Sequence, residues 1–118
     1  MKARLSYVGI ILAALVLAAC FAGCASEKTL YSWGQYEYQL YSFFKGESRE
    51  TLIMTMESDQ STIENSGEAL PPGFYAHMGM LYLENGNATG AAACFEREKA
   101  LFPEAAAFMD FLLKGMGR

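Results

Sequence analysis

The side chains of this 118-residue chain with the clearest scope for covalent chemistry are its cysteines. Cys20 and Cys24 come at the end of an apolar run from Tyr7 to Ala19, and small residues stand directly before each of them. Cys94 lies in the apolar run Ala-Ala-Ala-Cys-Phe and is expected to be a small buried hydrophobe. Modification of a thiol is therefore expected near the start of the chain, and no disulfide framework is expected.

His77 is the only histidine, which restricts the catalytic and metal sites that the chain can build. Leu81 stands at i+4 from it, where a zinc-binding helix would carry another ligand. A serine triad would also need His77, and no G-x-S-x-G elbow accompanies it. We therefore expect a histidine on a helix face or at a helix interface.

Three carboxylates, Glu96, Glu98 and Glu104, could form an acidic cluster. Arg97 and Lys99 are interleaved with them, which is more typical of a solvated helix face. The sequence thus predicts no catalytic residue, no cofactor and no metal site, and we do not expect an enzyme.

The segment around the first two cysteines resembles the lipobox of bacterial lipoproteins. Lys2 and Arg4 form a basic start, and the apolar run has the length of a signal-peptide core. This run is shorter than the ~20 residues that span a bilayer, which disfavours an uncleaved membrane anchor. The resemblance implies cleavage just before a cysteine whose thiol becomes a thioether to diacylglycerol. An ordinary secretory signal is the other alternative.

The two cysteines fit the lipobox pattern for different reasons. Leu17 stands three residues before Cys20, whereas Gly23 directly precedes Cys24. The leader is accordingly 1–23 with Cys24 lipidated, or alternatively 1–19 with Cys20 lipidated. Neither cysteine is followed by Asp, the residue that signals retention in the inner membrane of many lipoproteins. We therefore expect attachment to the outer membrane, facing the periplasm.

The charge of the mature chain limits its partners. Removal of the leader leaves seven basic and thirteen acidic side chains, a formal charge of −6. A nucleic-acid partner would require a basic face, and adhesion to anionic lipid would require the same. The acyl chains would therefore supply the anchoring, and the remaining chain is long enough for one small domain.

A polar tether, 24–29, precedes an aromatic-rich stretch over 30–44. Helical spacing places one set of side chains on a core line: Trp33, Tyr36, Leu40 and Phe44. Other aromatic side chains exceed what one side of a helix can bury: Tyr31, Tyr38 and Tyr41. They are either core at helix crossings or a patch that binds a partner, since tyrosine is frequent in binding hot spots.

Four further helices are predicted, over 47–64, 74–83, 88–101 and 104–113, and no segment has the pattern of a strand. The first should bury Leu52, Ile53, Met56 and Ile63. The last should cap the domain with Ala107, Phe108, Phe111 and Leu112.

Residues 72–105 carry the spacing of one tetratricopeptide unit. The positions that match are Tyr75, Met78, Gly79, Tyr82, Ala91, Phe95 and Pro103. Gly79 and Ala91 are small where two helices should cross, and Pro103 should end the second helix. Glu98 stands where alanine is usual, so packing there is altered or Glu98 points outward. One unit cannot bury its own apolar face, so 30–118 is predicted to be an all-α stack of about five helices.

Three longer segments resemble a family of small bacterial lipoproteins with a tetratricopeptide-like domain of unknown function. They are 30–41 (LYSWGQYEYQLY), 71–82 (PPGFYAHMGMLY) and 98–109 (EKALFPEAAAFM). The family's Gly-Cys-Ala leader end favours Cys24. Members often accompany a lipoprotein similar to the curli secretion channel, which implies a shared envelope assembly and no catalytic residue.

The expected function is a lipid-anchored periplasmic scaffold or adaptor that binds a partner protein or peptide in an envelope assembly, and the expected partner is another envelope lipoprotein. The alternative is a structural subunit of an outer-membrane lipoprotein complex without a peptide ligand. No small-molecule substrate and no nucleic acid is expected in either case.

Overall fold

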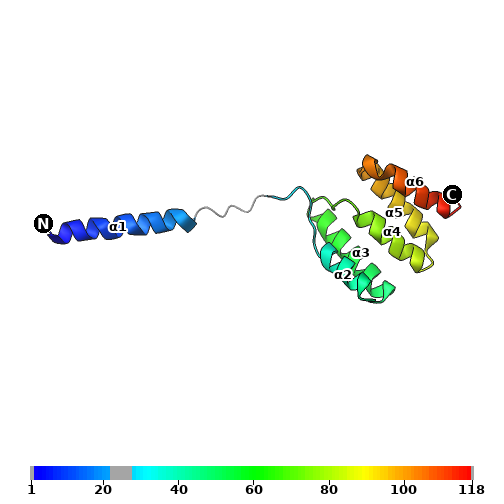
Figure 1. The fold of residues 1–118 in the computed structure, drawn as a ribbon, viewed down its shortest axis with the longest axis horizontal. Helices are drawn as coiled ribbons and strands as arrows, with labels where there is room; N and C mark the ends of the chain where they lie inside the picture. The colour runs from blue at the N-terminus through cyan, green and yellow to red at the C-terminus, as the bar shows by residue number, and fades with distance from the viewer. Residues whose placement is uncertain (1, 22–27, 118) are drawn as a thin grey trace.

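The computed structural model describes residues 2–21 and 28–117, and the regular elements in these ranges are all helical. The α-helices are α1 (Lys2–Phe21), α2 (Tyr36–Phe44), α3 (Arg49–Asn65), α4 (Phe74–Glu84), α5 (Ala88–Leu101) and α6 (Ala106–Gly115). A 3-10 turn, Pro103–Ala105, leads into α6. Figure 1 shows α2 to α6 as a stack in which each helix packs on the next. The prediction of an all-α helical stack is confirmed.

The N-terminal helix α1 presents its apolar side chains to solvent, from Tyr7 to Ala18. Among the described residues, no helix has the length and apolar character that crossing a membrane requires. Cys20 falls within α1, whereas Cys24 lies outside the described residues. Cleavage and lipidation at either cysteine therefore stay predictions.

Two clusters of buried side chains hold the stack together. The larger joins α2, α3 and α4, and its fully buried members include Leu52, Met56 and Phe74. The smaller joins α5 to α6 through Phe95 and Met109. Burial of apolar side chains on both sides of the α4–α5 hairpin is what a stack of repeats requires, because no single hairpin can bury its own apolar face.

Helices α4 and α5 approach closely at Gly79. A methyl group at Gly79 would lie 2.6 Å from Cε1 of Phe95 and 3.2 Å from the carbonyl oxygen of Ala91. Ala91 and Phe95 have no exposed surface, and Tyr75 and Met78 are also buried. The small residues of the repeat motif thus lie at the crossing, and the large ones fill the space around it.

The start of α4 is held by a side chain from α5. Ser48 and Asn87 cap α3 and α5, because their side-chain oxygens accept a backbone N–H of the first turn. Helix α4 begins after Gly73, which has no side chain that could supply such an acceptor. The carboxylate of Glu98 replaces it: the Gly73 N–H donates to Oε1 at 2.6 Å and the Ala76 N–H donates to Oε2 at 3.3 Å. A carboxylate there also meets the positive end of the helix dipole.

This arrangement corrects one expectation. Glu98 is only 2% exposed, so its assignment to a solvated helix face is wrong, although Glu96 and Glu104 are exposed as expected. The reason is the left-handed backbone at Gly73, with φ +90°, which brings the first N–H groups of α4 toward α5.

The core line predicted for the aromatic stretch is right at Tyr36, which is buried, and at Leu40, which packs on the core, but it is wrong at both ends. Trp33 lies before α2 and is 45% exposed, and Phe44 is 81% exposed. The helix starts only at Tyr36, which packs on the ring of Phe74 with 5.6 Å between ring centres. Contact with α3 and α4 therefore selects a different face, with Gln39 buried beside Tyr36.

The face of α6 that packs also differs from the prediction. Met109 and Leu113 are buried, whereas Phe108 and Phe111 are exposed and stack on each other at 6.5 Å between ring centres. Ala107 is exposed and Leu112 is half-buried. The buried contacts of Met109 and Leu113 with α5 set the rotation of α6, and the surface ion pair of Lys99 with Asp110, at 2.9 Å, is compatible with it.

His77 lies at the interface between α2 and α4, as the sequence predicts. Its ring is 5.2 Å from the ring centre of Phe43 and 6.2 Å from that of Tyr36. Nε2 is buried without a hydrogen-bond partner among the described residues. Burial lowers the pKa of His77 below 6.5, and nearby Glu84 and Arg49 act in opposite directions on it.

We expect Glu98→Gln to lower the free energy of unfolding by about 2 kcal/mol or more, because hydrogen bonds to a charged group contribute ~1.5–3 kcal/mol. The glutamine would also direct its amide N–H groups toward the donors of α4. Urea unfolding followed by circular dichroism measures the loss. Glu96→Gln removes the same charge from an exposed site on α5 and should cost at most ~1 kcal/mol. Equal losses in the two variants would contradict the capping role.

We expect stability to fall as the pH drops from 7.5 to 5.5, because the unfolded chain protonates His77 at a higher pH than the folded chain. The contribution is fully present above pH ~6.5 and is lost toward the lowered pKa. His77→Leu should remove this pH dependence without loss of stability at pH 7.5, because Nε2 has no partner to lose. Urea midpoints at the two pH values test this, and an unchanged slope in the variant would contradict it.

Candidate functional site: a polar groove across α3, α4 and α5

A groove runs along the stack where α3, α4 and α5 meet. It consists of two hollows of about 590 and 450 Å3 that share Glu64, Tyr75 and Arg97 as lining residues. Because α3, α4 and α5 each supply one of these three side chains, the groove is a product of the stack and of no single helix.

Hydrogen bonds fix the side chains at the centre of the groove. The Tyr75 hydroxyl donates to Oε1 of Glu64 at 2.6 Å. Nε2 of Gln60 donates to the Tyr75 hydroxyl at 3.2 Å and to Oε2 of Glu64 at 3.3 Å. The guanidinium of Arg97 lies 6.0 Å from the ring centre of Tyr75. Burial, followed by the bond to Glu64, raises the pKa of Tyr75 to about 12, so its hydroxyl stays a donor.

The two ends of the groove differ in polarity. One end is lined by Tyr31, Leu101 and Phe102, and the rings of Tyr31 and Phe102 meet edge to face at 6.0 Å. At the other end the Tyr82 hydroxyl donates to Glu57, and burial, followed by this bond, raises the pKa of Tyr82. The groove therefore offers an apolar end and a polar end on either side of Arg97.

Cys94 lies at the polar end of the groove without the properties of a nucleophile. The side chain is buried, as the sequence predicts, and packs in the larger core cluster. Burial and the nearby carboxylate of Glu57 raise the pKa of Cys94 to about 11. Since the thiolate is the reactive form, the thiol is inert at neutral pH.

The three tyrosines that the sequence offers as partner-binding candidates lie on two different surfaces. Tyr31 is half-buried in the wall of the groove. Tyr38 and Tyr41 are 64% and 58% exposed on α2 and do not line the groove. Reasoning from the sequence missed Glu64 and Arg97 as site residues.

One signal could have located the groove from the sequence. Tyrosine stands at positions 75 and 82 of the repeat motif, and a buried tyrosine hydroxyl requires a polar partner. The carboxylates of Glu57 and Glu64 on the preceding helix are those partners.

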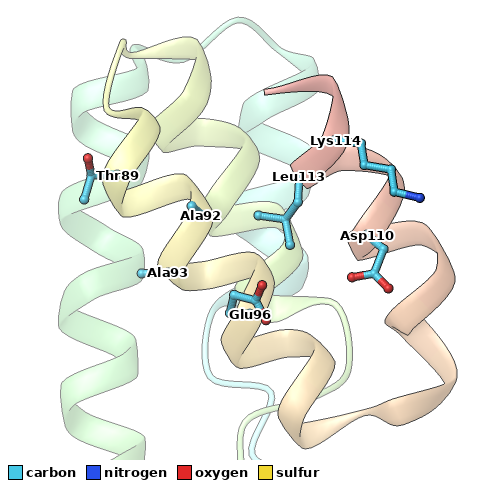
Figure 2. Close-up of a pocket in the computed structure, with 7 residues that line it drawn as sticks. All are labelled: Thr89, Ala92, Ala93, Glu96, Asp110, Leu113 and Lys114. Carbon is cyan, nitrogen blue, oxygen red and sulfur yellow. The ribbon is translucent and has the colours of Figure 1, made fainter. Parts of the chain in front are cut away.

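A separate hollow of about 440 Å3, outside the groove, lies between α5 and α6. Figure 2 shows Leu113 projecting toward Ala92 across it, with Glu96 and Asp110 at the rim. Both carboxylates are already paired with Lys99, each at 2.9 Å. This hollow thus has few free polar groups for a ligand. Within the described ranges, no group of three or more metal-binding side chains could hold an ion.

Fold and groove define an all-α repeat-like stack with a lateral groove across α3, α4 and α5. The chain belongs to the family of a domain of unknown function, DUF4810, whose model matches residues 30–112. That match covers α2 to α5, the groove and most of α6. Neither the curated proteins nor the solved structures contain a match to this chain.

Proposed function

We propose that the protein is a lipid-anchored scaffold or adaptor of the bacterial envelope that holds a segment of a partner protein in the groove. The observation that carries this proposal is the hydrogen-bonded set of Gln60, Glu64 and Tyr75 beside Arg97. Fixed polar side chains next to an apolar pocket are typical of sites that orient a peptide, because the polar groups set its direction and the apolar pocket takes a side chain.

The charges of the groove indicate the chemistry of the segment. Glu64 and Glu68 line the two hollows together with a single cation, Arg97, and Glu57 accepts from the hydroxyl of Tyr82, another lining residue. The mature chain is also acidic, which steers basic partners toward it. The groove therefore suits an extended segment with one apolar side chain, for the pocket at Tyr31 and Phe102, and a nearby basic residue.

The lipid anchor is the second part of the proposal. Its support is the small-residue sequence before Cys24, or alternatively Cys20, after a leader-like apolar run. The resemblance to small lipoproteins that accompany a curli-secretion-channel-like lipoprotein supports a place at the outer membrane, facing the periplasm, and a lipoprotein as partner.

A structural subunit without a peptide ligand is the alternative, and one observation favours it. Phe108 and Phe111 form a stacked, exposed apolar pair on α6, at the end of the stack. An exposed apolar surface of this kind suits permanent association with a neighbouring subunit.

We expect Glu64→Ala to reduce recovery of the groove partner by tenfold or more when the tagged full chain is isolated from its own envelope in mild detergent. Loss of Glu64 removes the acceptor of the buried Tyr75 hydroxyl and should cost ~1–3 kcal/mol of stability, so circular dichroism first establishes that the variant is folded, whereas a binding hot spot carries ~2 kcal/mol or more of binding energy. Glu50→Ala removes an exposed carboxylate from the same helix outside the groove and serves as the control. Quantitative mass spectrometry compares the three samples. Equal recovery with both variants would contradict the groove and favour the structural subunit.

We expect Cys24→Ser to abolish incorporation of a labelled fatty acid and to leave the chain unprocessed or soluble. Cys20→Ser should retain the label and the mature size, because a cysteine inside the leader is removed with it. The reverse result would assign the anchor to Cys20. Labelling that survives the double substitution would contradict the lipoprotein proposal.

A further inference from the structure

The outer face of α2 has the composition expected of a buried one. Tyr38, Tyr41 and Phe44 are 64%, 58% and 81% exposed, whereas polar Gln39 and Ser42 are buried against the rest of the stack. The inner side of α2 also carries apolar side chains, with Tyr36 buried and Leu40 and Phe43 packed on the core. The three further aromatic side chains on the outer side exceed what a helix that only covers a core needs, which indicates that this outer face is built for a contact of its own.

The position of α2 supports this interpretation. It is the first helix of the stack, at its edge in Figure 1, and within the described residues its main helix contact is with α3 on the inner side. Terminal elements of a repeat stack normally carry polar outer faces, because no neighbour covers them. Here three aromatic side chains stand at that position.

The residues of this face are arranged symmetrically about Tyr41. Tyr38 and Phe44 lie three positions to either side of it, and Glu37 and Lys45 lie four positions to either side. With 3.6 residues per turn, the four positions inside α2 and the C-cap residue Lys45 fall within about 60° of Tyr41 on one side of the helix axis. All five side chains are exposed.

A sequence with this symmetry is complementary to itself when two helices run in opposite directions. Tyr41 of one copy then lies opposite Tyr41 of the other, and Tyr38 lies opposite Phe44. Glu37 of each copy lies opposite Lys45 of the other, so both charge pairs are attractive. A parallel arrangement would bring Glu37 against Glu37 and Lys45 against Lys45. We propose that two copies of the protein pair antiparallel through the Glu37–Lys45 faces of their α2 helices.

The size of this surface predicts a weak pair. A nine-residue helix is about 13.5 Å long, so the area that it buries is below the ~800 Å2 per partner of a standard stable interface. Attachment of both copies to one membrane surface would raise their effective concentration. That contribution, though not the pairing face itself, rests on the proposed lipid anchor.

The test is photo-crosslinking of the full chain in intact cells, with a benzophenone amino acid in place of Tyr38. We expect illumination to give an adduct with twice the mass of the chain, containing only this protein. The same amino acid in place of Phe111, an equally exposed aromatic residue on α6, should give no such dimer.

Charge reversal tests the antiparallel register. In the benzophenone chain, Glu37→Lys or Lys45→Glu alone should reduce the dimer adduct by about fivefold to tenfold, because two attractive pairs become repulsive. The double variant should restore the adduct, and so should co-expression of the two single variants. The matched reversals Glu104→Lys and Lys114→Glu, on exposed positions outside α2, should leave it unchanged.

Three results would overturn the proposal. They are an adduct with lipid alone, an adduct with a different protein, and a dimer whose yield does not respond to the charge reversals. Failure of the proposed groove function can be told apart from failure of the proposed α2 pairing. Glu64→Ala should change capture of the groove partner and should leave the yield of the dimer adduct unchanged.

Discussion

A single buried carboxylate joins the two helices on which the rest of the stack is built. Glu98 of α5 accepts the N–H groups of Gly73 and Ala76, which α4 cannot satisfy with a side chain of its own. Burial of the carboxylate costs free energy, because a charge is removed from water. This desolvation cost is offset by the two hydrogen bonds and by the dipole of α4. Together with the close Gly79–Phe95 contact, the Glu98 contact fixes the axial position of α4 against α5.

The groove depends on that fixed position. Tyr75 follows Gly73 by two residues and Arg97 precedes Glu98 by one, so the capping contact places the two groove side chains side by side. Because the helices stack in chain order, the three surfaces described above lie on different helices. The groove crosses α3 to α5, the aromatic outer face belongs to α2, and the exposed phenylalanine pair belongs to α6. Such a separation would let one small domain hold a ligand and contact neighbours at the same time.

The sequence predicts best where the constraint is local. The small side chains of Gly79 and Ala91 predict a close helix crossing. The apolar spacing of Leu52, Met56 and Ile63 predicts the buried face of α3. The sequence does not predict which face of a short helix is buried when several faces are apolar, as α6 illustrates. Tertiary contacts decide there, and they also bury the Glu98 carboxylate that sequence patterning assigns to solvent. The groove was only partly predictable, because Glu64 and Arg97 acquire their role from their distance to Tyr75 in space.

Amide hydrogen exchange at Gly73 and Ala76, followed residue by residue with NMR, tests the capping contact most directly. The first N–H groups of a helix normally exchange fast, because they have no partner within the helix. The structure predicts that these two amides open only with the unfolding of the α4–α5 hairpin, and so exchange as slowly as the core of α4. Exchange at the rate of an unprotected amide, while the rest of α4 stays protected, would contradict the central role of Glu98.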